Sequence, residues 1–406
     1  MTALSTTRPG SHGVHGVGRS ARCPGSHCRL ARFAGAIILW CLAGTLLAPS
    51  PASRGGFALR KWGDGPGLCA EFVATSSNAQ DEDVVPVERL HEHANVEQVF
   101  YAYGHVVNAD DFAELAKIKS LRDVEIGVIG CGLDWATIDG DTSKLGALKQ
   151  VERISLNIEG IKDDDLRFVA ALPRLTCIEF NAGKPDEASD IKGPGCTDRC
   201  AEHLSRVVGL ESLTILDAGD GFSDRFVDLL TAGTQKLEWL DLDAPSLTDE
   251  SLRLLAERCP RLEHLMLGTE QLTDEGVRHL WQLENLRSLW LSSPKVTAKA
   301  VARIPGVRSV VLYGCDVSDQ GAETFANLRD LERLVLYGPQ FTDEQFRLFR
   351  NHPSLEEIIL NGKRLTRDAT LDVISSMPKL RSAIFPGNEA LEQAVGRVLV
   401  KRTHTP

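Results

Sequence analysis

The stretch "LEHLMLGTEQLTDEGVRHLWQLENLRSLWL", residues 262–291, contains one complete structural unit and the start of the next. Its first part has apolar residues at the spacing of a short β-strand, Leu262, Leu265 and Leu267. Its second part has apolar residues three apart, as on one face of a helix, Val277, Leu280 and Leu283. The stretch therefore predicts a strand, a turn and a helix.

The same unit recurs along most of the chain. Clear L-x-x-L-x-L starts lie at positions 237, 262, 286, 307, 331 and 355, and looser copies start at 96, 121, 151, 175, 210 and 380. Most steps between these twelve starts are 24 or 25 residues. One such unit cannot bury its apolar face alone, but stacked units can, with a parallel sheet on one side and helices on the other.

This pattern resembles the leucine-rich repeat family, in particular its cysteine-containing branch. The cysteines that carry the second resemblance are Cys315 in "VVLYGCDVSDQGA" and Cys259 in "LLAERCPRLEHLML". The resemblance covers about residues 96–386. It implies an α/β solenoid, a right-handed curved array with a concave parallel sheet and convex helices. It also implies reversible recognition of a protein or peptide.

Acidic pairs recur at one phase of the repeat, in "LTDES" (Asp249–Glu250), "LTDEG" (Asp274–Glu275) and "FTDEQ" (Asp343–Glu344). A catalytic pair would occur once. Here a Ser or Thr precedes each pair, just before the helical spacing begins, where its hydroxyl can accept a hydrogen bond from a free amide. We therefore interpret these residues as helix starts, with the carboxylates facing the positive end of the helix dipole.

The positions of the leucines within each repeat, here called the leucine phase, also predict which side chains face the open side of the sheet. The third, fifth and seventh positions of each L-x-x-L-x-L-x point away from the core. In the later repeats these positions carry aromatic, aliphatic and charged residues. We expect this concave surface to bind a partner through Trp239, Asp241, Asp243, His264, Met266, Trp290, Val311, Tyr313, Arg333, Val335, Tyr337 and Ile359. The alternative is that the aromatic rings only cover the sheet and touch one another.

The N-terminus looks like a targeting segment. Residues 1–63 contain eight basic residues and no Asp or Glu, and an apolar run of about 15 residues, 33–47, follows five arginines. We expect export or attachment to a membrane through this run. The remainder carries 37 basic and 56 acidic residues, a net charge of −19, which argues against nucleic acid as a partner.

The remaining candidate chemistry is sparse. Cys196 and Cys200 lie four apart after a polar loop, and we expect two free thiols rather than a disulfide. His91 and His93 have no third ligand at a suitable spacing, so we expect no metal site. No nucleophile motif is present. The sequence predicts no catalytic residue and no cofactor.

The chain is thus predicted to have a basic leader (1–52), a linker and N-terminal cap (53–95), the repeat array (96–386) and a C-terminal cap helix with a tail (387–406). We predict a non-enzymatic protein- or peptide-binding scaffold. The alternative is an intracellular substrate-recognition adaptor, since cysteine-containing repeats also resemble those of F-box proteins of ubiquitin ligases.

Overall fold

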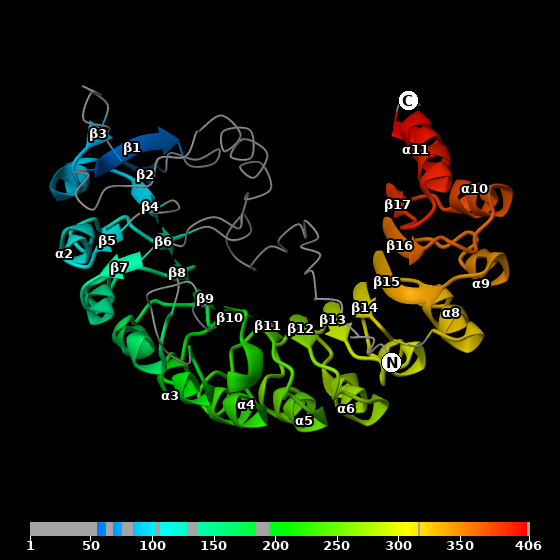
Figure 1. The fold of residues 1–406 in the computed structure, drawn as a ribbon, viewed down its shortest axis with the longest axis horizontal. Helices are drawn as coiled ribbons and strands as arrows, with labels where there is room; N and C mark the ends of the chain where they lie inside the picture. Colours follow the sequence, from blue (N-terminus) through cyan, green and yellow to red (C-terminus); the bar gives the residue numbers. More distant parts are fainter. Residues whose placement is uncertain are drawn as a thin grey trace, which may run out of the picture.

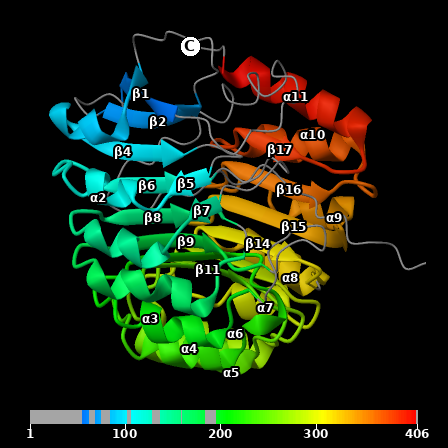
Figure 2. The same ribbon diagram turned by 60° about the vertical axis from the view of Figure 1, so that its left-hand side comes forward.

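The computed structural model describes residues 55–61, 68–74, 84–101, 106–127, 137–158, 160–183, 195–315 and 317–403. These residues form a curved array with strands lining its inner side and helices on its outer side (Figure 1). Seen from the side, the strands stack as nearly parallel rungs (Figure 2). The apolar 33–47 run lies outside the described residues.

The inner wall is one 15-stranded sheet whose order is β17-β16-β15-β14-β13-β12-β11-β10-β9-β8-β6-β4-β2-β1-β3. A second sheet pairs β5 (Val106–Asn108) with β7 (Thr137–Asp139). The strands of the large sheet are β1 (Gly55–Lys61), β2 (Leu68–Ala74), β3 (Val84–Val85), β4 (Val96–Tyr101), β6 (Asp123–Ile126), β8 (Arg153–Leu156), β9 (Cys177–Asn181), β10 (Ser212–Leu216), β11 (Trp239–Asp243), β12 (His264–Gly268), β13 (Ser288–Ser292), β14 (Ser309–Tyr313), β15 (Arg333–Gln340), β16 (Glu357–Asn361) and β17 (Ser382–Ile384).

The leucine phase sets the register of this sheet. Leu240 of β11 pairs with Leu265 of β12, which pairs with Leu289 of β13, and all three side chains are buried. Because side chains alternate along a strand, the residues between these leucines face the concave side. The predicted solenoid and its inward and outward phases are confirmed.

The outer wall consists of α-helices and 3-10 helices (η), so several predicted helices are tighter turns than expected. They are η2 (Val87–Glu92), α2 (Asp111–Leu115), η3 (Thr142–Ala147), η4 (Asp163–Ala171), η5 (Asp198–Cys200), α3 (Ala201–Leu204), η6 (Gly219–Gly221), α4 (Asp224–Thr231), α5 (Asp249–Arg258), α6 (Asp274–His279), η7 (Leu280–Gln282), α7 (Ala298–Val301), α8 (Asp319–Ala326), α9 (Asp343–Arg347), α10 (Arg367–Ser376) and α11 (Glu389–Thr403).

The two ends of the array are closed differently. Strand β2 pairs in parallel with β4 and so continues the sheet, and β1 then pairs antiparallel with β2. The segment that we expected to cover the first strand therefore contributes strands of its own. At the other end the predicted final helix is present as α11, which contacts β17 and α10. None of the helices that the structure describes is both long and apolar enough to cross a membrane.

Candidate interaction surface on the concave sheet face

Three rings form a continuous aromatic cluster on the later strands. Trp290 of β13, Tyr313 of β14 and Tyr337 of β15 are each partly exposed. The ring centroids of Trp290 and Tyr313 are 5.2 Å apart, and Tyr313 stacks on Tyr337 at 4.3 Å. These separations are typical of attractive aromatic pairs. We call these three residues the aromatic cluster.

Three aliphatic side chains lie in the floor of this cluster. Val311, Val335 and Ile359 face the concave side as predicted, but they are only 6%, 1% and 8% exposed. They form a small apolar core of their own with the aromatic cluster packed against it. The expectation that these three side chains offer exposed surface is wrong, because the large rings of neighbouring strands cover them. They support the surface instead of forming it.

A second aromatic contact joins the two strands that precede the strand of Trp290. The rings of Trp239 on β11 and His264 on β12 are 4.6 Å apart and tilted by 34°. Burial lowers the pKa of His264 and so favours the neutral imidazole. Its Nδ1 is buried without a hydrogen-bond partner among the described residues. Met266, between the two groups of rings, is half-buried.

The carboxylates of the concave face are held in an unfavourable environment. Burial, with the neighbouring Glu179 and Asp243, raises the pKa of Asp241 to about 7. Burial and the charge of Asp217 also raise the pKa of Asp243. On β6, burial and the charges of Asp123 and Glu179 raise the pKa of Glu125 to about 8. Burial is the main cause in each case, and a nearby cation would favour the ionised form of these carboxyl groups.

Glu125 and Glu179 are absent from the predicted set, although the sequence contains the signal for them. Both occupy the fifth position of L-x-x-L-x-L, the same phase as Asp241 and Trp290. The leucine phase already places both side chains on the concave face, and the register then joins β6 to β11 through the intervening strands and brings both into one row with Asp241.

Arg333 is paired within the chain. Its Nε donates to Glu357 Oε2 at 2.6 Å on the adjacent strand β16. Both side chains are partly exposed, so this pair contributes little to stability. The positive charge that we expected Arg333 to offer a partner is therefore neutralised by Glu357 in the free protein.

The recurring acidic pairs lie on the convex side and start helices, as predicted. The hydroxyl of Thr273 accepts a hydrogen bond from the backbone N–H of Glu275, and Thr248 caps α5 in the same way. The first Asp of each pair has a further role. Asp249 accepts from the backbone N–H and the hydroxyl of Thr273 in the next repeat, at 2.8 and 2.6 Å.

This double hydrogen bond repeats along the array and forms a ladder between neighbouring helix starts. Its N···O distances are 2.7–2.9 Å and its O···O distances 2.5–2.8 Å. The pairs are Asp163–Thr197, Asp198–Ser223, Asp224–Thr248, Asp249–Thr273, Asp274–Thr297 and Asp343–Thr366. These carboxylates are structural.

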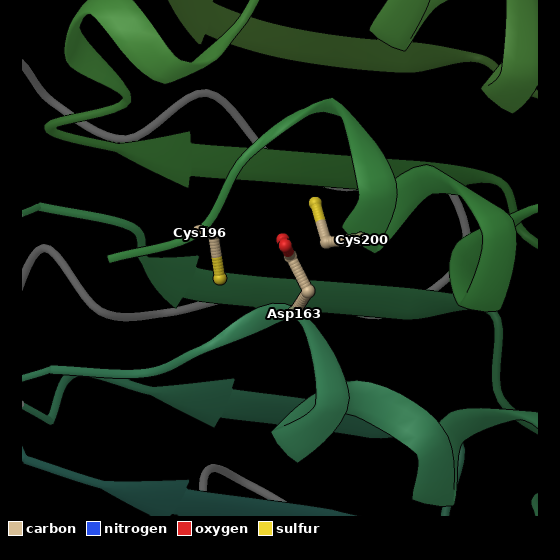
Figure 3. Close-up of side chains that lie close together, drawn as sticks. All are labelled: Asp163, Cys196 and Cys200. Atoms are coloured by element: carbon tan, nitrogen blue, oxygen red, sulfur yellow. The ribbon is translucent and has the colours of Figure 1, made fainter. Parts of the chain in front are cut away.

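Asp163, Cys196 and Cys200 bring three metal-ligating atoms within 4.8 Å of one another (Figure 3). Both cysteines are free, as predicted, and both are buried. Burial raises the pKa of the Cys200 thiol well above its usual value. The two oxygens of Asp163 already accept from Thr197, each at 2.7 Å.

The repeat explains this cluster without a metal. Cys196 stands at the core position that Phe222 and Leu247 occupy in later repeats. Cys200 corresponds to Ser251, whose hydroxyl donates to the Asp of an earlier repeat, Asp224. A structural zinc site takes four ligands. Among the described residues no fourth His, Cys, Asp or Glu joins these three.

Comparison with solved structures addresses the fold. No protein-family model and no curated protein sequence matches the chain. A chain of the Rad7–Elc1 complex of yeast superposes with a TM-score of 0.51 and 17% identity, over 72% of this chain and 76% of that one. An internalin (inlF) of Listeria monocytogenes gives 0.45 and 20% identity, over 78% and 87%. A TLR13–ssRNA13 complex gives 0.42 and 19%, over 74% and 40%. The periodic sequence, the continuous parallel pairing from β2 to β17 and the first of these likenesses show that the chain has the leucine-rich repeat fold.

Proposed function

We propose that the chain is a non-enzymatic scaffold that binds a protein on its concave sheet face. The observation that carries the proposal is the aromatic cluster: three large rings, partly exposed on three consecutive strands, resting on a buried aliphatic floor. Aromatic groups on a rigid support lose little conformational freedom on binding and often dominate binding energy.

The rings are not part of the main core. The main core lies on the other side of the sheet and is already closed by the inward leucines. Contiguous exposed apolar surface usually marks an interaction site. The similarity to a chain solved in a protein complex, Rad7 with Elc1, is consistent with a protein partner. Trp239, His264 and Met266 extend this proposed surface toward β11.

The test uses site-specific photo-crosslinking in the full chain. Trp290 is replaced with a photoreactive phenylalanine, and Val208, which is 68% exposed and lies outside the sheet, is replaced in the same way as the matched control. We expect covalent adducts to a discrete protein from position 290 and not from position 208.

A second measurement uses ordinary variants. Trp290→Ala with Tyr337→Ala should weaken capture of the cross-linked partner at least tenfold, about 1.4 kcal/mol. Val208→Ala should leave capture unchanged. The variants must keep the wild-type circular dichroism spectrum. Equal adduct formation at both positions, or capture that does not respond to the double substitution, contradicts the proposal.

The alternative proposal is an intracellular adaptor that recognises substrates for a ubiquitin ligase. The two roles differ in location. Determining the N-terminal residue of the mature protein and its cell fraction separates them: cleavage after the 33–47 run supports export, and intact Met1 in the cytosol supports the adaptor.

A further inference from the structure

One row of side chains crosses the concave face along the middle of every strand of the large sheet from β6 to β17. The register joins each member to the next without a break. The first half of this central row is acidic or hydroxylic: Glu125, Ser155, Glu179, Thr214 and Asp241.

The second half of the central row is apolar. It runs through Met266, Trp290, Val311, Val335, Ile359 and Ile384. Tyr313 and Tyr337 flank it. The character of the row changes once, between Asp241 and its direct neighbour Met266. The face therefore presents an acidic half and an apolar half in one line.

The acidic half has more carboxyl groups than cationic groups. On the concave faces of β6, β8, β9 and β11, five carboxyl groups face a single guanidinium, so the formal excess is four negative charges when all five are ionised, and a cation that approaches them favours that ionised form. The carboxylates are Asp123, Glu125, Glu179, Asp241 and Asp243. The guanidinium is Arg153, whose Nε lies 3.9 Å from Asp123 Oδ2.

These carboxylates do not converge on one point. The one set of three metal-ligating atoms within 4.8 Å in the described part of the chain is that of Asp163, Cys196 and Cys200, on other elements. A row of separated carboxylates suits several cations spread along a chain better than it suits one metal ion.

We infer that the partner is a protein segment lying across the strands, with Lys or Arg side chains on the Glu125–Glu179–Asp241 half and apolar side chains on the aromatic cluster. This inference rests on the proposed function and adds the chemistry and direction of the ligand. Charge complementarity selects the segment, and the apolar half holds it.

The spacing of the row defines the segment further. Neighbouring strands are about 4.8 Å apart, and the three carboxylates stand on every second strand, so they are about 10 Å apart. Asp241 and Trp290 are also two strands apart. A segment in the polyproline II conformation rises about 3.1 Å per residue with three residues per turn, so basic residues at every third position lie on one side about 9 Å apart and, followed by an aromatic or aliphatic residue, match this row.

The experiment selects binders from a displayed library of random 16-residue peptides on the full-length protein. Selected peptides are then synthesised, and their Kd is measured for three variants and the wild type. Glu179→Gln with Asp241→Asn neutralises the acidic half. Trp290→Ala with Tyr337→Ala removes two rings. Glu257→Gln with Glu275→Gln, two exposed carboxylates on α5 and α6, is the charge-matched control.

We expect enrichment of peptides with Lys or Arg on one side of aromatic or aliphatic residues. Their Kd should rise about tenfold in the Glu179/Asp241 variant and stay within twofold in the control. It should also rise between 50 and 500 mM salt, because exposed charges are screened.

Two other outcomes are informative. Peptides that depend on Trp290 and Tyr337 but lack basic residues, or that bind the Glu179/Asp241 variant as tightly as the wild type, overturn the basic-segment inference and leave the proposed function standing. Selected peptides that ignore Trp290 and Tyr337, or a selection that yields no binder, count against the concave face as the binding surface and so against both.

Discussion

Asp249 bridges two repeats: its carboxylate accepts a hydrogen bond from the backbone nitrogen of Thr273 at 2.8 Å and from its hydroxyl at 2.6 Å. Thr273 in turn accepts from the backbone N–H of Glu275. The carboxylate thus links the start of α5 to the start of α6. Hydrogen bonds to a charged group are stronger than those between neutral groups.

The ladder predicts that the two carboxylates of one acidic pair differ in importance. Asp249→Ala removes both hydrogen bonds and leaves a part-buried hydroxyl and amide without their acceptor. We expect it to lower the free energy of unfolding by about 1–3 kcal/mol. Glu250→Ala, its neighbour, loses only an exposed ion pair with Arg253 and should cost less than about 0.5 kcal/mol. Urea unfolding of both variants measures the difference; equal costs would refute a structural ladder.

The concave carboxylates predict a stability that falls as pH rises. The folded-state pKa of Asp241, about 7, lies well above the usual value of 3.8 for an aspartate side chain. Between these values the folded chain binds more protons than the unfolded chain, so stability is lost from about pH 4 to pH 7. Asp241→Asn, which cannot ionise, should be close to neutral at pH 4 and stabilise the fold by about 1–2 kcal/mol at pH 8, after allowance for solvent screening.

Thermal unfolding at the two pH values checks this prediction. Glu257→Gln on the convex side is the control, because its carboxylate is exposed and faces Arg253. A gain in melting temperature for Asp241→Asn that is the same at pH 4 and pH 8 would show that ionisation of this group is not the cause.

The repeat cysteines are predicted to be unreactive. Burial raises the pKa of Cys259 to about 12 and that of Cys315 to about 11. Their thiols contact backbone carbonyls of the preceding repeats, those of Thr234 and Ser293. At pH 8 almost no thiolate is present, so alkylation should be at least a hundredfold slower than in an unfolded peptide.

Peptide mass spectrometry after timed alkylation measures each cysteine separately. Cys69 is half-buried and serves as the internal comparison. Denaturant should make the buried sites react at the rate of free peptides. Rapid alkylation of Cys315 in the native protein would show that it is a reactive thiol and not a packed core group.

The sequence was sufficient to predict the solenoid, because the leucine phase repeats and each repeat has to pack on the next. It also predicted the capping Thr and Ser residues, which depend on local chain geometry. The ladder was missed for a physical reason: its partners are about 24 residues apart. The one-dimensional pattern shows a recurring Asp, but not that this Asp reaches the following repeat.

The leucine phase predicts on which face of the sheet a side chain lies, but not whether the side chain is exposed there. It correctly placed Val311, Val335 and Ile359 on the concave side, but it could not show that rings from adjacent strands cover them. Burial on an open sheet depends on the size of neighbouring side chains in three dimensions. Likewise Glu125 and Glu179 are ordinary acidic residues when each strand is considered alone. Only the sheet register shows that they belong to one row of side chains.

The ion pair of Arg333 and Glu357 lies beside the apolar half of the central row, so removal of either charge is expected to change peptide affinity there. Glu357→Ala leaves an unpaired guanidinium beside the aromatic cluster and should weaken binding of a basic-apolar peptide about twofold to threefold. Arg333→Ala leaves an unpaired carboxylate and should strengthen binding by a similar factor. Because both side chains are partly exposed, neither change should alter the free energy of unfolding by more than about 1 kcal/mol.

Binding isotherms at 50 mM salt, where screening is weak, measure both variants against the double variant Arg333→Ala with Glu357→Ala. The double variant has the net charge of the wild type and should bind as the wild type does. If the two single variants shift affinity in the same direction, their effect is one of packing and not of charge, and Arg333 does not contribute to charge selection.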